Sequence, residues 1–552
     1  MPDFFAQHSE TLDRAVEAIK NRSYWSAYPE HPKAYGEDAP ADGEDSFKRM
    51  LGEPFRLDQT HDGFVSVAES SPFGIELGID YPATGVDTVV SDAVSAMGTW
   101  AKATPDTRAG VCLEILDRLS GSSFQMGHAV MHTTGQSFLM AFQAGGPHAL
   151  DRGLEAVAYA YSAQTQLPGS VRWEKPQGSR PPIAIDKRWI LRPRGVAVTI
   201  GVSTFPTWNG YPGIFASLAT GNPVIVKPHP ETILPLAILV RTARAVIEDA
   251  GFDPNVIQLL VDSPSGLVAK DLVMRPEVGI VDYTGGTSFG DWLEAHAIHA
   301  EVFTEKSGVN SVILDSAPDL TPVFRNLSVS MSMYSGQMCT TPQNLFIPEN
   351  GIAVGDEQVS YDDVVSGFVA AIEGLLSDDA RASAILGAIK GDATLARAES
   401  AAGTGSVLSA PRSVENPDYA DAVVRTPAIV EVDSESEAYL DEMFGPVIYV
   451  VKTRSTDDSI SRANASAKQS GAITWLAYTT DDRVMDAVVD AAVDGGVSVA
   501  FNLTGGLFVN QSAAFSDFHV TGANGAGNAS LTDPAFVASR FRVIGVRTEV
   551  PS

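Results

Sequence analysis

The fold is decided by residues 195–290, a stretch in which short apolar runs alternate with helical patterns. The runs read GVAVTIGV at 195–202, PVIV at 223–226, VIQLLV at 256–261 and VGIVDYTGG at 278–286. Apolar residues between the second and third runs recur with the spacing of a helix, and a shorter helix is expected near 211–220. Strands that are apolar along their whole length are typical of parallel sheets covered on both faces. The stretch therefore predicts an α/β fold that binds ligands beyond the carboxyl ends of its strands.

A second alternating region runs from about residue 310 to residue 502. It includes a predicted helix at 361–376 and strand-like runs at 428–432 and 447–451. The last fifty residues are rich in glycine and predict loops. We expect two α/β domains joined edge to edge.

The residues before the first run are mainly helical in pattern. Residues 4–20 predict an amphipathic helix, and residues 86–165 predict several long helices. Residues 24–60 are rich in Pro, Gly, Asp and Glu and predict a wrapping loop.

The composition bounds the class of protein. The chain has 552 residues, 44% of them hydrophobic, and a formal net charge of −30. Such an acidic surface repels the phosphate backbone of nucleic acids, so we do not expect a nucleic acid as partner. No stretch approaches the ~20 apolar residues that span a bilayer, and residues 1–10 lack the features of a secretory signal. We expect a cytoplasmic protein that binds neither nucleic acid nor membrane.

Cysteine and histidine usage indicates a reducing compartment and no metal site. The two cysteines, Cys112 and Cys339, are too few for a disulfide framework. Cys112 lies in an apolar helical segment and is interpreted as a core residue. His128 and His132 have helical i, i+4 spacing but lack the glutamate of the zinc-protease motif. We therefore expect no metal.

The surroundings of Cys339 indicate a nucleophile. Gly336 and Gln337 allow a tight turn just before it, and Thr340 begins what looks like a helix or strand boundary. A thiol beside free backbone N–H groups at a helix terminus is activated for covalent catalysis. A single cysteine in a long chain is more often structural, so this pattern alone leaves both interpretations open.

Five segments, in order along the chain, resemble the signature segments of the aldehyde dehydrogenase superfamily. They are TWN at 207–209, VIVKP at 224–228, TGGTSFG at 284–290, GQMC at 336–339 and EMFGPV at 442–447. Each segment alone is weakly specific, but the ordered set is strongly specific. The resemblance implies an aldehyde dehydrogenase-like fold, with a Rossmann-like cofactor domain, a second α/β catalytic domain and a small oligomerisation hairpin. It also implies NAD- or NADP-dependent oxidation of an aldehyde to a carboxylic acid.

The resemblance also implies domain boundaries. Residues 1–171 and 194–304 would form the cofactor-binding domain, and residues 305–515 the catalytic domain. Residues 172–193 and 535–552 would form oligomerisation segments, so a homodimer or homotetramer is expected.

Each matched residue acquires an implied role. Cys339 would attack the aldehyde carbon, and the Asn209 amide and the Cys339 N–H would hold the oxyanion, at ~3–4 kcal/mol of barrier for each donor. The residues implied to contact the cofactor are Lys227, Gly285, Gly290, Glu442, Phe444 and Trp208. Phe515 is implied to contact the substrate. If the five segments did not occur together in this order, ordinary structural roles would be the preferred interpretation of Asn209, Lys227 and Glu442.

Glu305 is the candidate general base, although the family's usual Glu-Leu-Gly-Gly-Lys segment is replaced by FTEKSGVN at 303–310. Its separation from Cys339, 339 − 305 = 34 residues, matches the spacing expected in the superfamily. A carboxylate in an apolar tunnel should have a raised pKa that suits it to activating water. The alternative is that Glu305 only pairs with a nearby cation.

The cofactor preference stays open. Lys227 would hydrogen-bond the adenosine ribose, and many NAD-preferring relatives carry a glutamate three residues after this lysine. Here that residue is Pro230, followed by Glu231. The change removes one barrier to the 2′-phosphate, so the sequence favours NADP only slightly over NAD.

Two further segments resemble the PaaN-type phenylacetate-degradation proteins: FFAQHSETLD at 4–13, with YWSAYPE at 24–30, and AFSDFHVTGAN at 514–524. This resemblance implies an aromatic-ring-cleavage semialdehyde as substrate, with CoA-linked aldehydes among the candidates. A basic cluster from Lys187 to Arg194 could bind an acyl-CoA, but in this family the region is more often an oligomerisation hairpin.

Two alternatives remain. A CoA-acylating dehydrogenase would pass the acyl group to CoA, although Glu305 argues against it because that chemistry needs no water-activating carboxylate. A catalytically silent scaffold protein would not need Cys339, Asn209 and Glu305 together. Retention of NAD(P) and fast reaction of Cys339 with a thiol reagent would distinguish an enzyme from a scaffold.

Overall fold

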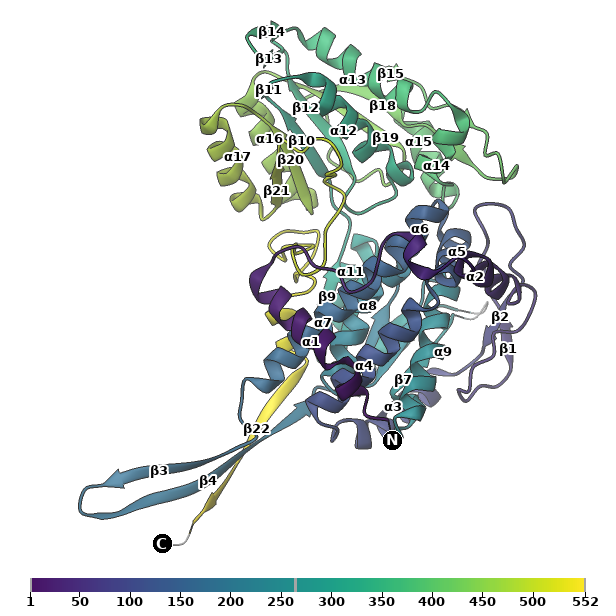
Figure 1. Ribbon diagram of the computed structural model, residues 1–552. Coiled ribbons are helices and arrows are strands. Elements are labelled where there is room, and N and C mark those ends of the chain that lie inside the picture. The colour runs from purple at the N-terminus through teal and green to yellow at the C-terminus, as the bar shows by residue number, and fades with distance from the viewer. Residues whose placement is uncertain (1, 263–265, 551–552) are drawn as a thin grey trace.

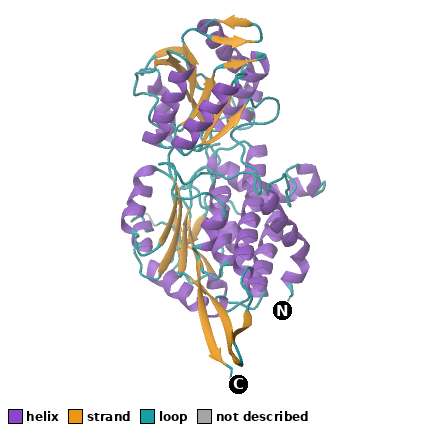
Figure 2. Cartoon of the chain, turned by 90° about the vertical axis from the view of Figure 1, so that its left-hand side faces the viewer, coloured by secondary structure: helices purple, strands orange, loops and turns teal. Residues whose placement is uncertain are grey.

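The computed structural model describes residues 2–262 and 266–550. These residues form two stacked α/β units and a long arm that projects from one of them (Figure 1, Figure 2). The lower unit contains a five-stranded sheet, and the upper unit contains a seven-stranded sheet. No helix of the described chain combines the length and apolar character that crossing a membrane requires.

The lower unit contains the sheet predicted from residues 195–290. All five strands are parallel and largely buried. They are β5 (Val196–Ile200), β6 (Val224–Lys227), β7 (Ile257–Leu259), β8 (Val278–Thr284) and β9 (Glu301–Glu305). The helices that accompany them are α8 (Pro206–Ala219), α9 (Leu234–Asp249), α10 (Ala269–Val273) and α11 (Thr287–His296). The prediction of a parallel α/β sheet is confirmed.

The strand order of the lower sheet, β7-β6-β5-β8-β9, reverses direction next to β5. From β5 the chain moves outward through β6 and β7, and then returns to place β8 on the other side of β5. In open α/β sheets the crevice for a ligand lies at the carboxyl ends of the strands where the order reverses. The crevice of this chain is therefore expected beyond the ends of β5 and β8.

The upper unit contains a sheet in the order β15-β18-β19-β12-β10-β20-β21, in which β15 alone pairs antiparallel. Its strands are β10 (Asn310–Leu314), β12 (Pro342–Pro348), β15 (Ser406–Ser409), β18 (Ala428–Asp433), β19 (Val447–Thr453), β20 (Thr474–Tyr478) and β21 (Ser498–Phe501). Its helices are α12 (Leu320–Ser332), α13 (Tyr361–Leu375), α14 (Asp379–Leu386), α15 (Asp392–Ala401), α16 (Thr456–Ser470) and α17 (Asp482–Gly495). The helix predicted at 361–376 and the strands predicted at 428–432 and 447–451 are confirmed.

The N-terminal residues are mostly helical, as expected. The helices are α1 (Phe4–Asn21), α3 (Val86–Trp100), α4 (Pro105–Ser120), α5 (Ser123–Thr134), α6 (Phe138–Gly145) and α7 (Pro147–Thr165). The prediction of a loop over residues 24–60 is wrong for α2 (Ala39–Lys48). A proline stands in the first turn of α2, and Phe47 is 2% exposed with its ring stacked on His132 at 5.1 Å. Phe47 anchors this polar helix, whose composition resembles that of a loop.

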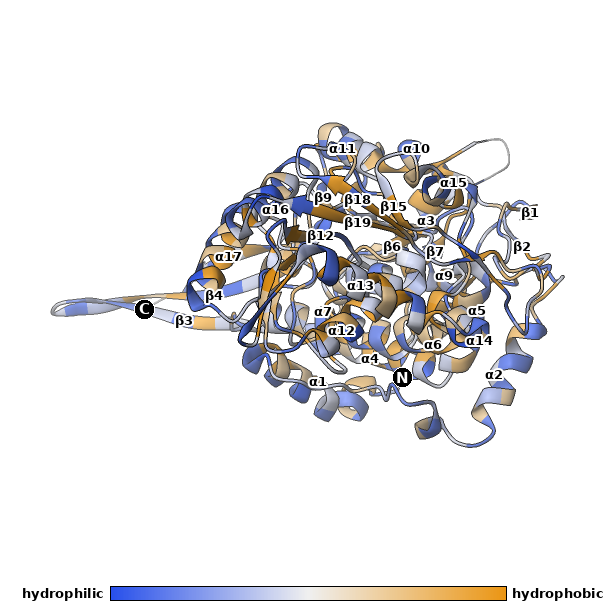
Figure 3. Cartoon of the chain, turned by 90° about the horizontal axis from the view of Figure 1, so that it is seen from above, coloured by the Kyte–Doolittle hydropathy of each residue, from blue (hydrophilic) through white to orange (hydrophobic). Residues whose placement is uncertain are grey.

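The arm is an antiparallel sheet in the order β22-β4-β3. Its strands are β3 (Ser170–Gln177), β4 (Arg180–Pro193) and β22 (Phe541–Glu549). Figure 3 shows apolar colour on the strands inside the molecule and mixed colours along the arm. The arm carries half-exposed apolar side chains, which are Val171, Trp173, Ile183, Ile190, Val543 and Ile544.

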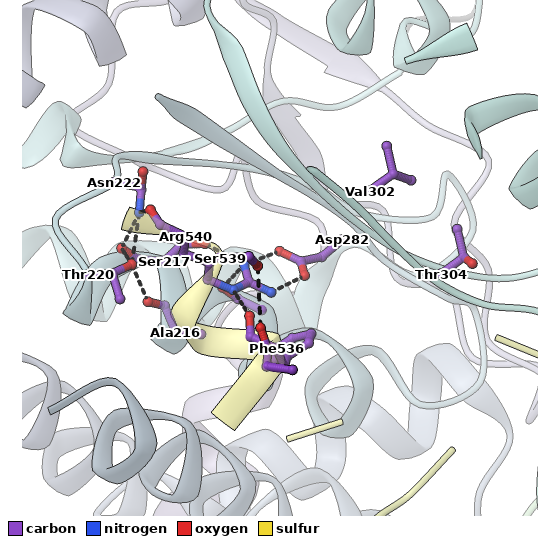
Figure 4. Close-up of polar contacts among 12 residues, drawn as sticks. Ala216, Ser217, Thr220, Asn222, Asp282, Val302, Thr304, Phe536, Ser539 and Arg540 are labelled. Atoms are coloured by element: carbon purple, nitrogen blue, oxygen red, sulfur yellow. Dashed lines mark hydrogen bonds and ion pairs between the residues drawn. The ribbon is translucent and has the colours of Figure 1, made fainter. Parts of the chain in front are cut away.

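Arg540 fixes the base of this arm to the lower unit, just before β22 begins (Figure 4). Its guanidinium is fully buried and donates to both carboxylate oxygens of Asp282, at 2.6 and 2.8 Å. It also donates to the Ser217 hydroxyl at 2.8 Å and to the Phe536 carbonyl at 3.0 Å. Asp282 lies on β8, so the arm is tied to the strand next to the expected crevice.

Asp282→Asn should destabilise the protein strongly. The substitution leaves the buried Arg540 charge without its carboxylate, and breaking a buried pair in this way costs about 3–5 kcal/mol. The measurement is the melting temperature of the full chain. Glu44→Gln, which removes the partner of Lys48 in an exposed pair at 2.6 Å, is the control and should leave the melting temperature unchanged. Equal melting temperatures for Asp282→Asn and the unmodified protein would contradict this role.

Candidate active site

Four segments that are far apart in the sequence meet at the carboxyl edge of the lower sheet. Asn209 lies in the first turn of α8, Glu305 ends β9, Cys339 follows a short 3-10 turn, and His519 lies in a C-terminal loop. The Glu305 carboxylate, the Cys339 thiol and a His519 ring nitrogen lie within 4.8 Å of one another. The structure thus brings the three predicted catalytic residues together and adds a histidine.

The Glu305 carboxylate is buried and well supplied with hydrogen-bond donors. One oxygen accepts from the Asn209 amide at 2.8 Å, and the other accepts from His519 Nε2 at 3.0 Å. Burial raises the pKa of Glu305, but the electrostatic effect of His519 and the hydrogen bonds from His519, Cys339 and Asn209 outweigh it and lower the pKa below its usual value. The expectation of a raised pKa is therefore wrong, because the carboxylate sits among donors rather than in a purely apolar tunnel.

The loop before Cys339 has an unusual backbone, which explains the Gly-Gln sequence. Tyr334 and Ser335 have φ values of 51° and 50°, and Gly336 follows at 67°. A Cβ on Gly336 would lie 2.3 Å from the Gly445 carbonyl oxygen, so only glycine fits. Tyr334 Oη donates to the Thr134 carbonyl at 2.5 Å, which anchors the loop to the lower unit.

The Cys339 thiol is held next to anionic groups. Its Sγ lies 3.6 Å from His519 Nε2, and its carbonyl accepts from the Asn310 amide at 2.7 Å. Burial raises the pKa of Cys339 well above its ordinary value, and Glu305 and Glu442 add to this effect. The resting thiol is therefore protonated, and the expectation of a thiolate activated by a helix terminus is wrong for this state.

His519 is a site residue that the sequence did not single out. It is 3% exposed, and its ring meets the Trp208 ring edge-on at 4.6 Å. It stands inside the segment 514–524 that carries the PaaN-type resemblance, but a single histidine in a loop has no spacing pattern that links it to Cys339, 180 residues away. The resemblance of the segment 514–524 was the one feature of the sequence that could have pointed to His519.

The carboxyl edge of the lower sheet has features that suit the phosphates of a dinucleotide. The N-terminus of α11 carries no side-chain cap, and a Cβ on its N-cap residue Gly286 would meet nothing within 4 Å. Free N–H groups facing open space at the end of β8 fit the phosphates of such a cofactor. A cavity of about 350 Å³ adjoins this edge and is lined by residues that include Ile200, Thr284, Asn209 and Glu305.

Gly285, Gly290 and Lys227, which were predicted to contact the cofactor, also make contacts within the protein. A Cβ on Gly285 would lie 2.4 Å from Tyr283 Oη, and one on Gly290 would lie 2.5 Å from the Lys306 side chain. Lys227, at the end of β6, pairs with Asp262 and donates to the Pro228 carbonyl at 3.1 Å. Their contacts with a cofactor remain predictions.

Glu442 and Phe444 lie on the other side of the Cys339 loop. They line a cavity of about 280 Å³ together with Gly336, Met338 and neighbouring residues. Burial raises the pKa of Glu442, and its carboxylate accepts from the Gly308 N–H at 3.3 Å. Two carboxylates therefore flank the candidate nucleophile.

Trp208 and Phe515 occupy different environments. Trp208 packs between the His519 ring and the Arg152 guanidinium, which lies 5.1 Å from its ring centre. Phe515 is fully buried, and its ring meets Trp25 at 4.8 Å. Phe515 thus supports the loop that carries His519, and its contact with a substrate remains a prediction.

Comparisons with known proteins point to one family. The family model described as the aldehyde dehydrogenase family matches residues 80–507. The chain is 50% identical to a structure described as NAD-dependent aldehyde dehydrogenase from Burkholderia multivorans, with a TM-score of 0.98 and full coverage of both chains. It is 25% identical over 402 residues to N-succinylglutamate 5-semialdehyde dehydrogenase from Ectopseudomonas mendocina, covering 70% of this chain and 75% of that protein. An NADP complex of glyceraldehyde-3-phosphate dehydrogenase from Bacillus halodurans shares the fold, with a TM-score of 0.70, 17% identity and coverage of 90% and 98%.

Proposed function

The chain belongs to the aldehyde dehydrogenase family, and we propose that it oxidises an aldehyde to a carboxylic acid through a thioester on Cys339, with NAD or NADP as hydride acceptor. The aldehyde dehydrogenase-like fold expected from the sequence is confirmed. The observation that carries the proposed chemistry is the meeting of Glu305 and Cys339, with the Asn209 amide bonded to the carboxylate.

In the first half-reaction, the Cys339 thiol loses its proton to solvent, Sγ bonds to the aldehyde carbon, and the carbonyl oxygen takes the electron pair of the broken π bond and becomes anionic. The Asn209 amide and the Cys339 backbone N–H donate to this oxygen. A bound nicotinamide cofactor would supply the acceptor for the hydride that leaves the carbon, which leaves a thioester on Cys339. Asn209 bonds Glu305 in the resting state, so it exchanges that bond for one to the oxyanion.

In the second half-reaction, Glu305 takes a proton from a water molecule whose oxygen attacks the thioester carbon. The C–S bond then breaks, the acid leaves, and the proton held by Glu305 passes to the Cys339 sulfur, which restores both groups. The pKa of Glu305 is lowered against the effect of burial by the electrostatic effect of His519 and by its hydrogen-bond donors, so this base is ionised at neutral pH. A water-activating carboxylate beside Cys339 supports hydrolysis over transfer of the acyl group to CoA.

The proposed substrate is a semialdehyde formed when an activated aromatic ring is opened, either free or CoA-linked. The support is the PaaN-type resemblance, whose two segments touch each other next to the site. The ring centres of Trp25 and Phe515 lie 4.8 Å apart. A semialdehyde dehydrogenase among the relatives supports the same class of substrate.

The test is reduction of NAD and of NADP by the purified protein with aliphatic, aromatic and CoA-linked semialdehydes. Turnover that releases a free acid, with no requirement for added CoA, supports the proposal. Formation of an acyl-CoA only when CoA is added would establish the CoA-acylating alternative. Cofactor binding without turnover on any aldehyde would favour a silent relative.

The proposed cofactor is NAD or NADP, and comparing kcat/KM for the two would show which one the enzyme prefers. Pro230 stands where many NAD-preferring relatives carry a glutamate, and the nearby Glu231 is exposed. The carboxylate that pairs with Lys227 is instead that of Asp262. A kcat/KM at least tenfold higher with NADP would support the interpretation of Pro230.

The arm is the proposed oligomerisation element, in line with the proposed segments 172–193 and 535–552. The cofactor domain would then comprise residues 1–171 and 194–304, and the catalytic domain residues 305–515. Lys187 of the basic cluster packs over Trp173 within the arm, which favours a structural role over CoA binding. The expected assembly is a homodimer or homotetramer, which light scattering on the purified protein would measure.

Asn209→Ala should slow thioester formation by roughly 10²–10³-fold, because one of two oxyanion donors is lost. The measurement is the rate of the first turnover by stopped-flow detection of reduced cofactor. Asn464→Ala, which removes an amide on α16 that donates to Asp494, is the control and should have no effect. A negligible effect of Asn209→Ala would remove Asn209 from the proposed oxyanion site.

A further inference from the structure

His519 contacts both the proposed general base, Glu305, and the proposed nucleophile, Cys339. Its Nε2 lies 3.0 Å from a Glu305 oxygen and 3.6 Å from Cys339 Sγ. The ring is held in place by the edge-on contact with Trp208, and its backbone N–H donates to the Leu531 carbonyl at 3.1 Å. The histidine is therefore fixed between the two groups.

The hydrogen-bond pattern locates the His519 proton. An ionised carboxylate can only accept, so the nitrogen facing Glu305 carries the hydrogen. The other ring nitrogen, Nδ1, is buried and has no hydrogen-bond partner among the described residues. His519 is therefore a donor at this site, and its Nε2 has no lone pair to take the thiol proton.

A thiolate at Cys339 would form in a difficult environment. The titratable groups that face the thiol are Glu305, Glu442 and His519, and two of them are carboxylates. A second anion beside Glu305 repels the first, and burial limits its solvation. A donor shared by both anions stabilises the pair more than it stabilises the carboxylate alone.

We propose that His519 is a further catalytic residue whose single Nε2–H is shared between the Glu305 carboxylate and the Cys339 thiolate. As the S–H bond breaks, the proton leaves to solvent, and His519 neither gains nor loses one. After acylation the sulfur is no longer anionic, and the same N–H returns fully to Glu305 during thioester hydrolysis. The inference rests on the proposed function only in taking Cys339 as the nucleophile.

The test is the pH dependence of Cys339 alkylation by iodoacetamide in the full-length protein, which needs neither aldehyde nor cofactor. His519→Phe keeps a ring against Trp208 but removes the N–H. At neutral pH its alkylation should be about tenfold slower, with the profile displaced to higher pH, because the thiolate loses a charge-assisted hydrogen bond. His519→Gln keeps an N–H donor and should recover most of the rate.

Controls separate this role from packing. His132→Phe changes another buried histidine that stacks on Phe47, and it should leave Cys339 alkylation unchanged. Peptide mass spectrometry distinguishes Cys339 from the buried Cys112, whose pKa is raised by burial to about 12. If His519→Phe does not fold, as judged by its melting temperature, His519→Met serves as the donor-free variant.

The outcomes decide between three situations. A displaced profile in the donor-free variant, restored by glutamine, supports the shared hydrogen. An unchanged profile in a folded donor-free variant overturns it, even if thioester hydrolysis slows, because His519 would then only position Glu305. Alkylation that depends on His519 without oxidation of any aldehyde would leave this inference standing and remove the proposed function instead.

Discussion

Replacing Cys339 by alanine should abolish aldehyde oxidation, while the protein still binds its cofactor. The reason is that no other described thiol lies near Glu305 and Asn209, since Cys112 is fully buried in the N-terminal helices. The expected rate is the uncatalysed background, measured as production of reduced cofactor with the best aldehyde of the panel. The Kd for the cofactor, measured by quenching of protein fluorescence, should equal that of the unmodified protein.

The matched control is Cys112→Ala, which removes the other cysteine of the chain. It truncates a buried side chain and should lower the melting temperature modestly, with turnover unchanged at ordinary temperature. Turnover by Cys339→Ala at more than a trace of the normal rate would show that the acyl group is not carried by Cys339.

Glu305→Gln should give a burst of about one equivalent of reduced cofactor per site and then stall. The glutamine can still bond its neighbours but cannot take a proton from water, so the thioester forms and persists. General-base catalysis contributes roughly 10²–10⁴-fold, and the steady-state rate should fall by a factor in that range. The measurement is stopped-flow absorbance of reduced cofactor, in which burst and steady state are read from one trace.

Glu301→Gln, on the same strand, is the control for Glu305→Gln. Glu301 is one-third exposed and pairs with Arg194 at 3.0 Å, at the far end of β9 from the site. Its variant should turn over at the normal rate without a burst. A Glu305→Gln enzyme that turns over normally would show that another group activates the water.

The pH dependence of hydrolysis follows from the lowered pKa of Glu305. A carboxylate whose pKa is lowered stays ionised as the pH falls, until the pH passes below the usual range for glutamate. An acid limb near neutrality in the thioester-hydrolysis rate would therefore have to come from a different group. A raised pKa would have produced that limb from Glu305 itself.

Local patterns were sufficient to predict the sheet but not the backbone of the catalytic loop. The apolar runs at 195–290 specify buried parallel strands because their burial depends on their own residues. The left-handed conformations of Tyr334 and Ser335 depend on contacts from elsewhere, such as the bond from Tyr334 to the end of α5 and that from Ser335 to the Leu386 carbonyl. Nothing within the Cys339 segment shows those contacts.

Electrostatic partners were also beyond the reach of the sequence. Asp282 and Arg540 are 258 positions apart, Lys227 and Asp262 are 35 apart, and Glu305 and His519 are 214 apart. A motif identifies a carboxylate or a lysine, but its pKa depends on which donors the fold brings to it. This is why Glu305 was identified as the candidate base while the direction of its pKa shift was wrong.

The decisive experiment on the thioester mechanism is mass spectrometry of Glu305→Gln, quenched with acid after the burst. We expect the peptide containing Cys339 to gain the mass of the acyl group of the aldehyde used, while the peptide containing Cys112 is unchanged. If the unmodified enzyme oxidises that aldehyde and the burst occurs, but the Cys339 peptide carries no acyl group, then the thioester mechanism is contradicted.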